Sequence, residues 1–394
     1  MLNTKFSPWP SYSAEELGAV ADVMSSNRVN YWTGEQGRLF EKEFAAWAGT
    51  KHAIALANGT LALDLALKGL GIGNGNGDEI IVTPRSFIAS VSCVINAGAI
   101  PVFADVDPAS GNLTADTIRS KLTAKTRGII VVHIAGWPCN MTDIMALANE
   151  HGIKVVEDCA QANGACHAGQ SVGTLGHVGA WSFCQDKIMT TGGEGGMVTT
   201  NDPLLWDKMW SFKDHGKSWD AVYNREHPAG FRWVHETIGT NWRMLEMQAA
   251  IGRVQLKKLP LWTARRTEIA DRYARSTQAF PGALYTPMVA GGDVHAFYRF
   301  YCYVKPEGLN DGWSRDRIVS EMNAMQYPLM QGSCSEIYRE KAFGENGLRP
   351  LERLSDAATL GETSLCFLTH PTLRDDEVEE IAAGFESIMQ KAAR

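Results

Sequence analysis

The stretch RGIIVVHIAGWPCNMTDIMALANEHGIKVVED, residues 127–158, decides the fold. It begins and ends with short apolar runs at 127–136 and 153–158, and residues 143–152 between them have helical composition. Strands that are apolar throughout are buried on both faces, and a helix between two such strands is typical of a parallel pair. The stretch therefore predicts a strand, a helix and a second strand within one parallel sheet.

The same alternation extends outward on both sides. Further apolar runs stand at residues 53–56, 79–84, 100–106, 180–183 and 196–200, and helical composition recurs at 60–70 and 91–99. Seven runs that alternate with helical or turn-rich segments predict an α/β fold with a mostly parallel sheet covered on both faces. The ligands of such sheets bind at the carboxyl ends of the strands.

Domain organisation follows from the segments that flank this core. Ser13 stands three residues before Glu16, as in a capping box, and predicts a first helix over about 13–25. Residues 211–242 form a long irregular stretch, which is usually functional or contacts another subunit. A helical stretch then runs to Pro260, and we place the boundary near it: a large domain over 1–255 and a smaller α+β domain over 256–394.

Composition excludes several classes of protein. The chain has 394 residues and a formal net charge of −7, so a general affinity for nucleic acid is not expected. None of its eight cysteines forms a Cys-x-x-Cys pair, which is typical of reduced thiols and not of a disulfide framework. The N-terminus lacks a signal-peptide pattern, and no apolar run approaches the ~20 residues of a membrane span. We expect a soluble cytoplasmic protein.

Familiar ligand motifs fail on spacing. The glycines at 69, 71, 73, 75 and 77 do not fit Gly-x-Gly-x-x-Gly and follow a helical pattern, so they predict a turn. His215-Gly-Lys-Ser resembles the end of a P-loop, but Ser211 occupies the position of its first glycine. No His-Glu-x-x-His is present, and we predict no metal site.

Four other segments together indicate a cofactor. Asp158 ends an apolar strand, where a buried carboxylate is costly unless it meets a cation. Lys187 follows Ser182 in a turn-rich segment, and Gly59-Thr60 opens a helix whose N–H groups could hold a phosphate. Phe87 follows a strand, where its face could stack on a planar ring. A lysine for a Schiff base, an acid, a phosphate cradle and a stacking aromatic are what pyridoxal phosphate requires.

The segments in order resemble the DegT/StrS-type sugar aminotransferases, which have the pyridoxal-phosphate-dependent transferase fold type I. The likeness covers nearly the whole chain, including ALANGT, DEIIVTPRSFIAS, VVEDCAQANGA, AWSFCQDKIMTTGGEGGMVTT and GTNWRMLEMQAA. It implies a homodimer with shared active sites. It also implies transfer of an amino group from an amino acid, by default L-glutamate, to a keto group, by default C4, of a nucleotide-linked deoxysugar through pyridoxamine phosphate.

The resemblance assigns roles to individual residues. Lys187 would be the Schiff-base lysine and Asp158 the partner of the pyridine nitrogen. Gln161 would lie beside the ring hydroxyl, Phe87 against the ring face, and Asn241 at the phosphate of the partner subunit's cofactor. Gly59, Thr60 and Ser182 would bind the phosphate.

Each assignment has an ordinary structural alternative. Asp158 could be a turn residue, Thr60 and Asn241 helix caps, Ser182 a core hydroxyl and Phe87 a core aromatic. For Gln161 a purely structural hydrogen bond is nearly as plausible as a cofactor contact. His215 could approach the substrate or only the dimer interface.

The sequence departs from the family pattern at two places near the lysine, and two rival functions are alternatives to the aminotransferase. An extra glycine stands in Thr191-Gly-Gly-Glu-Gly-Gly, and Gln185-Asp186 precedes the lysine where the family often has Pro-Thr or Gly-Asn. The rivals are a sugar dehydratase of the same fold, which replaces the lysine by histidine, and a non-catalytic cofactor-binding regulator. Lys187 argues against the first and the Asp158/Lys187 pair against the second.

Overall fold

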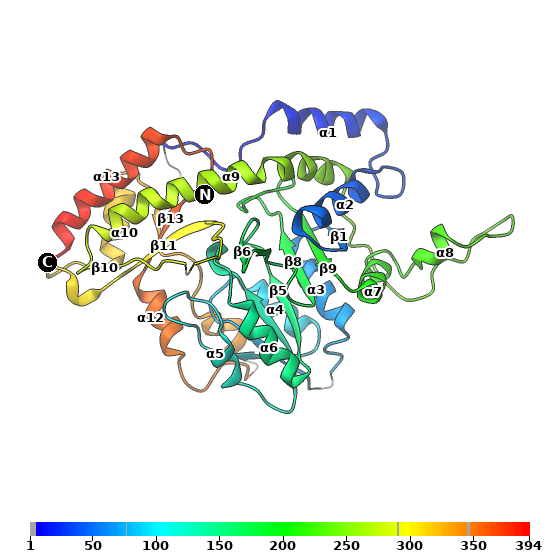
Figure 1. The fold of residues 1–394 in the computed structure, drawn as a ribbon, viewed down its shortest axis with the longest axis horizontal. Coiled ribbons are helices and arrows are strands. Elements are labelled where there is room, and N and C mark those ends of the chain that lie inside the picture. The colour runs from blue at the N-terminus through cyan, green and yellow to red at the C-terminus, as the bar shows by residue number, and fades with distance from the viewer. Residues whose placement is uncertain (1–4, 76, 290, 345–346) are drawn as a thin grey trace.

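The computed structural model describes residues 5–75, 77–289, 291–344 and 347–394. Its central feature is a seven-stranded sheet with helices on both faces (Figure 1). The strands of this sheet are β1 (His52–Leu56), β2 (Glu79–Val82), β3 (Ile100–Phe103), β4 (Thr126–Val132), β5 (Lys154–Asp158), β8 (Val178–Ser182) and β9 (Gly196–Thr200). All seven predicted strands are therefore confirmed.

The strand order is β1-β9-β8-β5-β4-β2-β3. β9 pairs antiparallel with both β1 and β8, whereas the pairs β8/β5, β5/β4, β4/β2 and β2/β3 are parallel. The mostly parallel α/β fold is confirmed. Because β1, β2, β5 and β8 share one direction, the turns that follow them meet at one edge of the sheet.

Helices cover this sheet and contribute its core. Those of the first two thirds of the chain are α1 (Ala14–Ser26), α2 (Gln36–Ala48), α3 (Gly59–Leu70), α4 (Ala89–Asn96), α5 (Ala115–Arg119), α6 (Met141–His151), α7 (Pro203–Lys213) and α8 (Trp219–Tyr223). The predicted helices at 60–70, 91–99 and 143–152 correspond to α3, α4 and α6. The capping box that starts α1 at Ser13 and Glu16 is present.

A second, four-stranded antiparallel sheet lies towards the C-terminus. It consists of β10 (Leu284–Tyr285), β11 (Arg299–Val304), β13 (Ser364–Leu368) and β12 (Leu329–Met330), in that order. Its helices are α10 (Arg315–Ala324), α11 (Lys341–Gly344), α12 (Ser355–Thr363) and α13 (Asp375–Ala392). A separate two-stranded hairpin joins β6 (Cys166–His167) to β7 (Gln170–Ser171).

One long helix, α9 (Glu246–Gln278), connects the two sheets (Figure 1). It continues through Pro260, where the sequence suggested an end. α9 packs on α1 and α2 near its start and on α13 further along, so tertiary contacts support it on both sides of the proline. The division at residue 255 stays a prediction, and it falls inside α9.

The glycines at 71, 73, 75 and 77 form the predicted turn, since all four have positive φ angles. The irregular segment after α7 carries α8 and then a loop that projects from the body of the molecule (Figure 1). None of the described helices combines the length and apolarity needed to cross a lipid bilayer.

Candidate active site

A pocket of about 480 Å³ lies where the turns after β1, β2, β5 and β8 meet. Seven of the eight predicted cofactor residues line it: Gly59, Thr60, Phe87, Asp158, Gln161, Ser182 and Lys187. They come from segments far apart in the sequence and converge because their strands end at the same edge of the sheet. The eighth, Asn241, does not line this pocket.

Asp158, the last residue of β5, is only 5% exposed. Its Oδ2 accepts a hydrogen bond from Ser90 Oγ at 2.7 Å, and its Oδ1 accepts one from the N–H of Ala160 at 3.1 Å. Burial raises the pKa of this carboxyl, and the bonds from Ser90 and Ala160 offset part of that rise. No residue in the described ranges forms an ion pair with Asp158, and the more distant charge of Lys187 lowers the Asp158 pKa by less than burial raises it.

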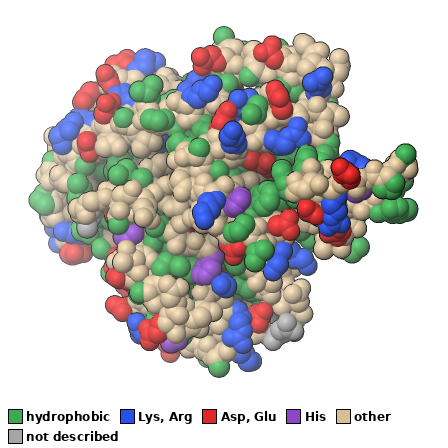
Figure 2. Space-filling model, turned by 45° about the vertical axis from the view of Figure 1, so that its right-hand side comes forward, with side chains coloured by type: hydrophobic (Ala, Val, Ile, Leu, Met, Phe, Trp, Pro, Cys, Tyr) green, Lys and Arg blue, Asp and Glu red, His purple; other side chains and the backbone are tan. Residues whose placement is uncertain are grey.

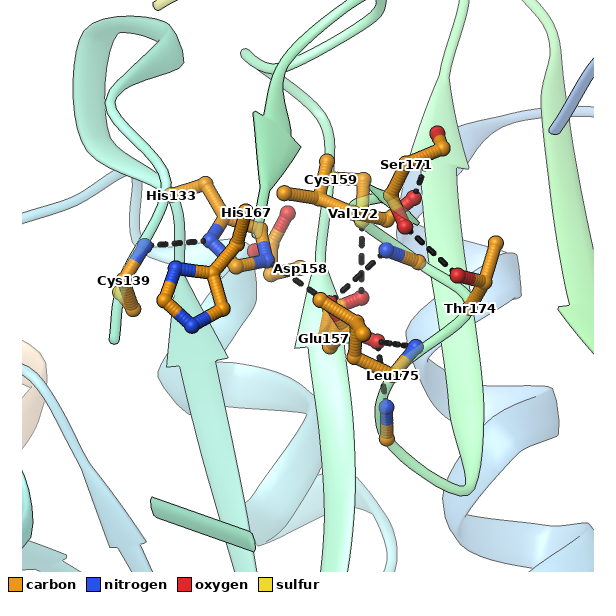
Figure 3. A network of polar contacts seen from close by, with 12 residues as sticks. His133, Cys139, Glu157, Asp158, Cys159, His167, Ser171, Val172, Thr174 and Leu175 are labelled. Carbon is orange, nitrogen blue, oxygen red and sulfur yellow. Dashed lines mark hydrogen bonds and ion pairs between the residues drawn. The ribbon is translucent and has the colours of Figure 1, made fainter. Parts of the chain in front are cut away.

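A buried network beside Asp158 fixes the end of β5 (Figure 3). Glu157 accepts hydrogen bonds from the N–H groups of Gly173, Leu175 and Gly176 at 2.8, 2.8 and 2.6 Å. His133 Nδ1 accepts the N–H of Cys139 at 3.0 Å, so its Nε2 carries a proton and donates to Glu157 Oε2 at 3.1 Å.

Three residues of this network could in principle bind a metal ion, but their ligand atoms are already used in hydrogen bonds. His133, Glu157 and Cys159 are close enough together to hold a metal ion. However, the protonated Nε2 of His133 has no free lone pair, and both Glu157 oxygens already accept hydrogen bonds. We interpret the cluster as a structural support for the strand that carries Asp158.

Lys187 lies in the turn between β8 and β9, with its side chain mostly buried. Trp9 Nε1 donates to its backbone carbonyl at 2.9 Å, which anchors the turn to the N-terminal segment. Burial disfavours the ammonium, but Tyr298, Asp186 and Asp158 outweigh it, so the pKa of Lys187 is raised.

The Gly59-Thr60 turn opens α3 and lines the pocket, where we predict the phosphate site. Asn58 caps the helix by accepting the N–H of Leu61 at 3.0 Å. A Cβ on Gly59 would lie 2.5 Å from Ser182 Cβ, so only glycine lets the helix start approach β8 this closely. Gly59, Thr60 and Ser182 therefore line one pocket at the N-terminus of α3, which is where a helix favours a phosphate.

Phe87 and Gln161 differ in how far the structure supports their roles. Phe87 is 67% exposed although it lines the pocket, so it is not the core aromatic of the alternative interpretation. Gln161 Oε1 accepts the N–H of Ala135 at 2.8 Å, which is the structural hydrogen bond considered above. Because Oε1 already accepts this hydrogen bond, the amide nitrogen of Gln161 would be the atom that contacts the cofactor.

Asn241 lies outside the pocket, on the segment after the projecting loop. Asn241 is exposed, and its backbone forms an isolated antiparallel β-bridge with Asp214. Its assignment to the partner subunit's cofactor stays a prediction, and its place away from this chain's own pocket agrees with that assignment.

Nearly the whole chain is similar to known aminotransferases. Residues 10–386 match the DegT/DnrJ/EryC1/StrS aminotransferase family. The chain belongs to this family. An aminotransferase from Psychrobacter cryohalolentis of known structure is 56% identical, with a TM-score of 0.96 over 98% of this chain and 99% of that one.

Two further relatives are each 34% identical to this chain over 387 residues. They are the spore coat polysaccharide biosynthesis protein SpsC of Bacillus subtilis and the UDP-N-acetyl-3-dehydro-alpha-D-glucosamine 3-aminotransferase of Acidithiobacillus ferrooxidans. Each alignment spans 97% of this chain, and it spans 96% and 95% of the two relatives respectively. The fold, with its parallel sheet and second smaller sheet, is that of pyridoxal-phosphate-dependent transferases of fold type I.

Several lining residues of the aminotransferase were missed by the sequence analysis. Asn58 could have been found, since Asn directly before a predicted helix is a capping signal. Ser90 stands three residues after Phe87, one helical turn on, but nothing in the sequence announced its bond to Asp158. Glu194 also lines the pocket, and only the fold of the turn between β8 and β9 brings its side chain there.

The extra glycine forms part of a tight turn beside Lys187. Gly192 and Gly193 have φ angles of 86° and 121°, which favour glycine. The Glu194 carbonyl accepts hydrogen bonds from Thr191 Oγ1 and from Gln248 Nε2 at 2.8 Å. The turn directs the Glu194 side chain to the pocket, where Oε1 lies 3.8 Å from Cys184 Sγ.

The residues present fit pyridoxal phosphate. The buried Asp158 has no ion-pair partner among the described residues, and a protonated pyridine nitrogen would supply one. The cradle at Gly59 is shaped by a contact that a Cβ would block, and Lys187 lines the same pocket. These are three independent requirements of the cofactor, and one pocket meets all of them.

Proposed function

We propose that this aminotransferase uses pyridoxal phosphate, held through Lys187, to transfer the amino group of L-glutamate to the C4 keto group of a nucleotide-linked deoxysugar. The observation that carries the proposal is the convergence of Lys187, Asp158 and the Gly59 cradle on one pocket. Bound there, the cofactor supplies an electron sink for deprotonation at the amino acid's α-carbon.

The chain's own residues have separable tasks in this reaction. Asp158 keeps the ring nitrogen protonated, because a buried carboxylate without another cation favours a positive partner. Lys187, when not attached to the cofactor, is the base that moves a proton from the donor's α-carbon with its Nζ. Thr60, Ser182 and the N–H groups at the start of α3 orient the phosphate.

The acceptor has room in an adjoining pocket of about 510 Å³. It shares Phe87, Gln161, Asp186 and Lys187 with the first pocket. The C-terminal part of the chain supplies the opposite wall through Tyr298, Ser333, Cys334, Ile337 and Glu340. A sugar placed between these walls would have its keto carbon beside Lys187, and the name of the Acidithiobacillus relative supports a nucleotide-linked substrate.

The irregular segment 211–242 and its flank offer five cations as candidates for binding the substrate's diphosphate: Lys213, Lys217, Arg225, Arg232 and Arg243. Lys213 is wrong in that role, because it is fully buried beside Glu41. Lys217 and Arg243 both pair with Asp214. Arg225 pairs with Asp220 and Glu236. Arg232 is exposed and makes no ion pair within the described ranges, so we propose it as the first of these cations to meet the diphosphate.

The projecting loop supports a homodimer. Figure 2 shows hydrophobic side chains gathered at the tip of this projecting loop, away from the body of the molecule. Phe231, Trp233 and Ile238 on this loop are 74%, 83% and 92% exposed. Three large apolar side chains on one projecting loop are typical of a protein interface. A second copy that covers this loop would also bring Asn241 towards its neighbour's pocket.

The direct test is product analysis. The purified enzyme, loaded with pyridoxal phosphate, is incubated with glutamate and a panel of UDP-, GDP- and dTDP-linked keto sugars. We expect mass spectrometry to find an aminated nucleotide sugar and 2-oxoglutarate, and NMR to place the amine at C4. Amination at C3 would correct the carbon. Absence of any aminated sugar, with an active related enzyme as control, would contradict the proposal.

A further inference from the structure

Asp186 stands directly before Lys187 and faces it. Its Oδ1 lies 3.8 Å from Lys187 Nζ. Within the described ranges it is the only carboxylate that forms an ion pair with this lysine. Because the family often has Thr or Asn at this position, the contact belongs to this chain and not to the general pattern.

Tyr298, which directly precedes β11, and Arg299, its first residue, hold Asp186 in place. The Tyr298 hydroxyl donates a hydrogen bond to Asp186 Oδ2, and Arg299 Nη2 lies 4.0 Å from the same oxygen. Arg299 is itself fixed, since its guanidinium stacks 4.2 Å from the Tyr298 ring centroid and Nη1 donates to the Tyr298 carbonyl at 2.8 Å. The carboxylate is therefore clamped between the turn that carries Lys187 and the second sheet.

Several titratable groups share the two pockets with Lys187. The carboxylates are Asp158, Asp186, Glu194 and Glu340, of which Asp186 alone forms an ion pair with Lys187 in the described ranges, and the Tyr298 ring centroid is 5.2 Å from Lys187 Nζ. Cys184 stands on the same turn, and Arg299 approaches from β11. When the cofactor is bound, Asp158 is committed to the ring nitrogen. Asp186 then remains as the carboxylate beside a protonated Lys187.

We infer that Asp186, clamped by Tyr298 and Arg299, is a positioning residue that retains the unattached Lys187 amine beside the pocket and sets its proton affinity. The inference rests on the proposed function for its role in the reaction, but the contact itself does not. Arg299 limits the effect, because it neutralises part of the Asp186 charge. The amine therefore stays able to give up the proton that it has taken.

The test begins with full-length protein freed of cofactor. The pH dependence of Lys187 acetylation, followed by peptide mass spectrometry, measures the pKa of this one amine. Asp186→Asn should lower that pKa by roughly 0.5 pH unit, the size of a partly exposed ion pair. Asp186→Glu, which keeps the charge, should restore most of it. Asp376→Asn, at a solvent-exposed ion pair with Arg374, is the matched control and should change nothing.

The loaded enzyme provides the second measurement. The acid limb of the pH profile of kcat should move to lower pH in Asp186→Asn and return in Asp186→Glu. An unchanged Lys187 titration in Asp186→Asn would overturn the inference, as would an equal shift in Asp376→Asn. A shifted titration with an unchanged kcat profile would overturn the role in the reaction. Failure of the wild-type enzyme to aminate any sugar would contradict the proposed function, but it would not affect the conclusion from Lys187 acetylation.

Discussion

Asp158 shows how a single residue can serve function at the expense of stability. The sequence places a carboxylate at the end of an apolar strand, and the structure buries it with two hydrogen bonds and no ion pair in the described part of the chain. Burying such a group without a cation costs free energy. The proposed function accounts for this cost, because the protonated ring nitrogen of the cofactor would supply a cation to Asp158.

Replacement of Asp158 by Asn should therefore have opposite effects on turnover and on stability. Turnover should fall by about 100-fold or more, because the ring nitrogen loses its proton-holding partner. The melting temperature of the cofactor-free protein should rise near neutral pH. The folded-state pKa of Asp158 is raised, so wild-type stability is lost as pH increases through that pKa, and Asn avoids this loss.

Differential scanning calorimetry of both cofactor-free proteins between pH 4 and pH 8 provides the measurement. The gain in melting temperature of the variant should grow with pH and vanish at the acid end. A variant that is less stable at neutral pH, or a difference that does not depend on pH, would contradict this explanation of Asp158.

Prediction from sequence reached Lys187 and Asp158 because each sits in a local pattern: a turn beside a strand and a strand end. It did not reach the clamp on Asp186. Tyr298 is separated from Asp186 by 112 residues, and no periodicity or motif links them. Such contacts arise only when β11 folds against the turn that carries Lys187.

Among the elements, the start of α3 carries the proposed phosphate site. Gly59→Ala places a Cβ 2.5 Å from Ser182 Cβ and 3.1 Å from Ser182 Cα. The helix start must then move away from β8. We expect the affinity for pyridoxal phosphate to fall at least about tenfold, equivalent to ~1.4 kcal/mol of binding free energy.

Gly18→Ala is the matched control for this change. Gly18 lies within α1, and a Cβ there would meet no atom within 4 Å. This variant should bind the cofactor like wild type and gain about 0.5 to 1 kcal/mol of stability from helix propensity. Fluorescence titration with the cofactor measures both variants. Equal affinities for Gly59→Ala and Gly18→Ala would refute the cradle.

The helices and strands of the large sheet were predictable because their apolar runs are short, regular and separated by clear turns. α9 was not, since Pro260 suggested an end that the structure does not have. A proline removes one hydrogen-bond donor, which costs about 3 kcal/mol in an isolated helix. Packing of α9 against α1, α2 and α13 offsets this cost, and such packing cannot be read from local sequence.

At the scale of the whole molecule, the projecting loop suggests that one chain does not complete the site. The sequence marked residues 211–242 as irregular, and the structure shows an exposed apolar tip followed by Asn241 outside its own pocket. The shape of this arm and its distance from the body could not be predicted, because neither depends on a repeating pattern.

Subunit complementation tests whether the sites are shared. A heterodimer of a Lys187→Ala chain and an Asn241→Ala chain, isolated by two different tags, contains one site with both native residues. We expect about half of the wild-type turnover per dimer, since one of two symmetric sites is intact. The control pairs a Lys187→Ala/Asn241→Ala chain with a Lys187→Ala chain and should be inactive. A heterodimer no more active than the two parent homodimers would show that Asn241 does not act across subunits.

Lys187 is the residue that we propose carries the cofactor. Borohydride reduction of the loaded enzyme, followed by peptide mass spectrometry, tests this proposal most directly. We predict a phosphopyridoxyl group on Lys187, its loss in Lys187→Ala, and protection from this labelling when glutamate is added before the borohydride. A label on a different lysine, or an unlabelled protein that still binds pyridoxal phosphate and aminates sugars, would contradict the account.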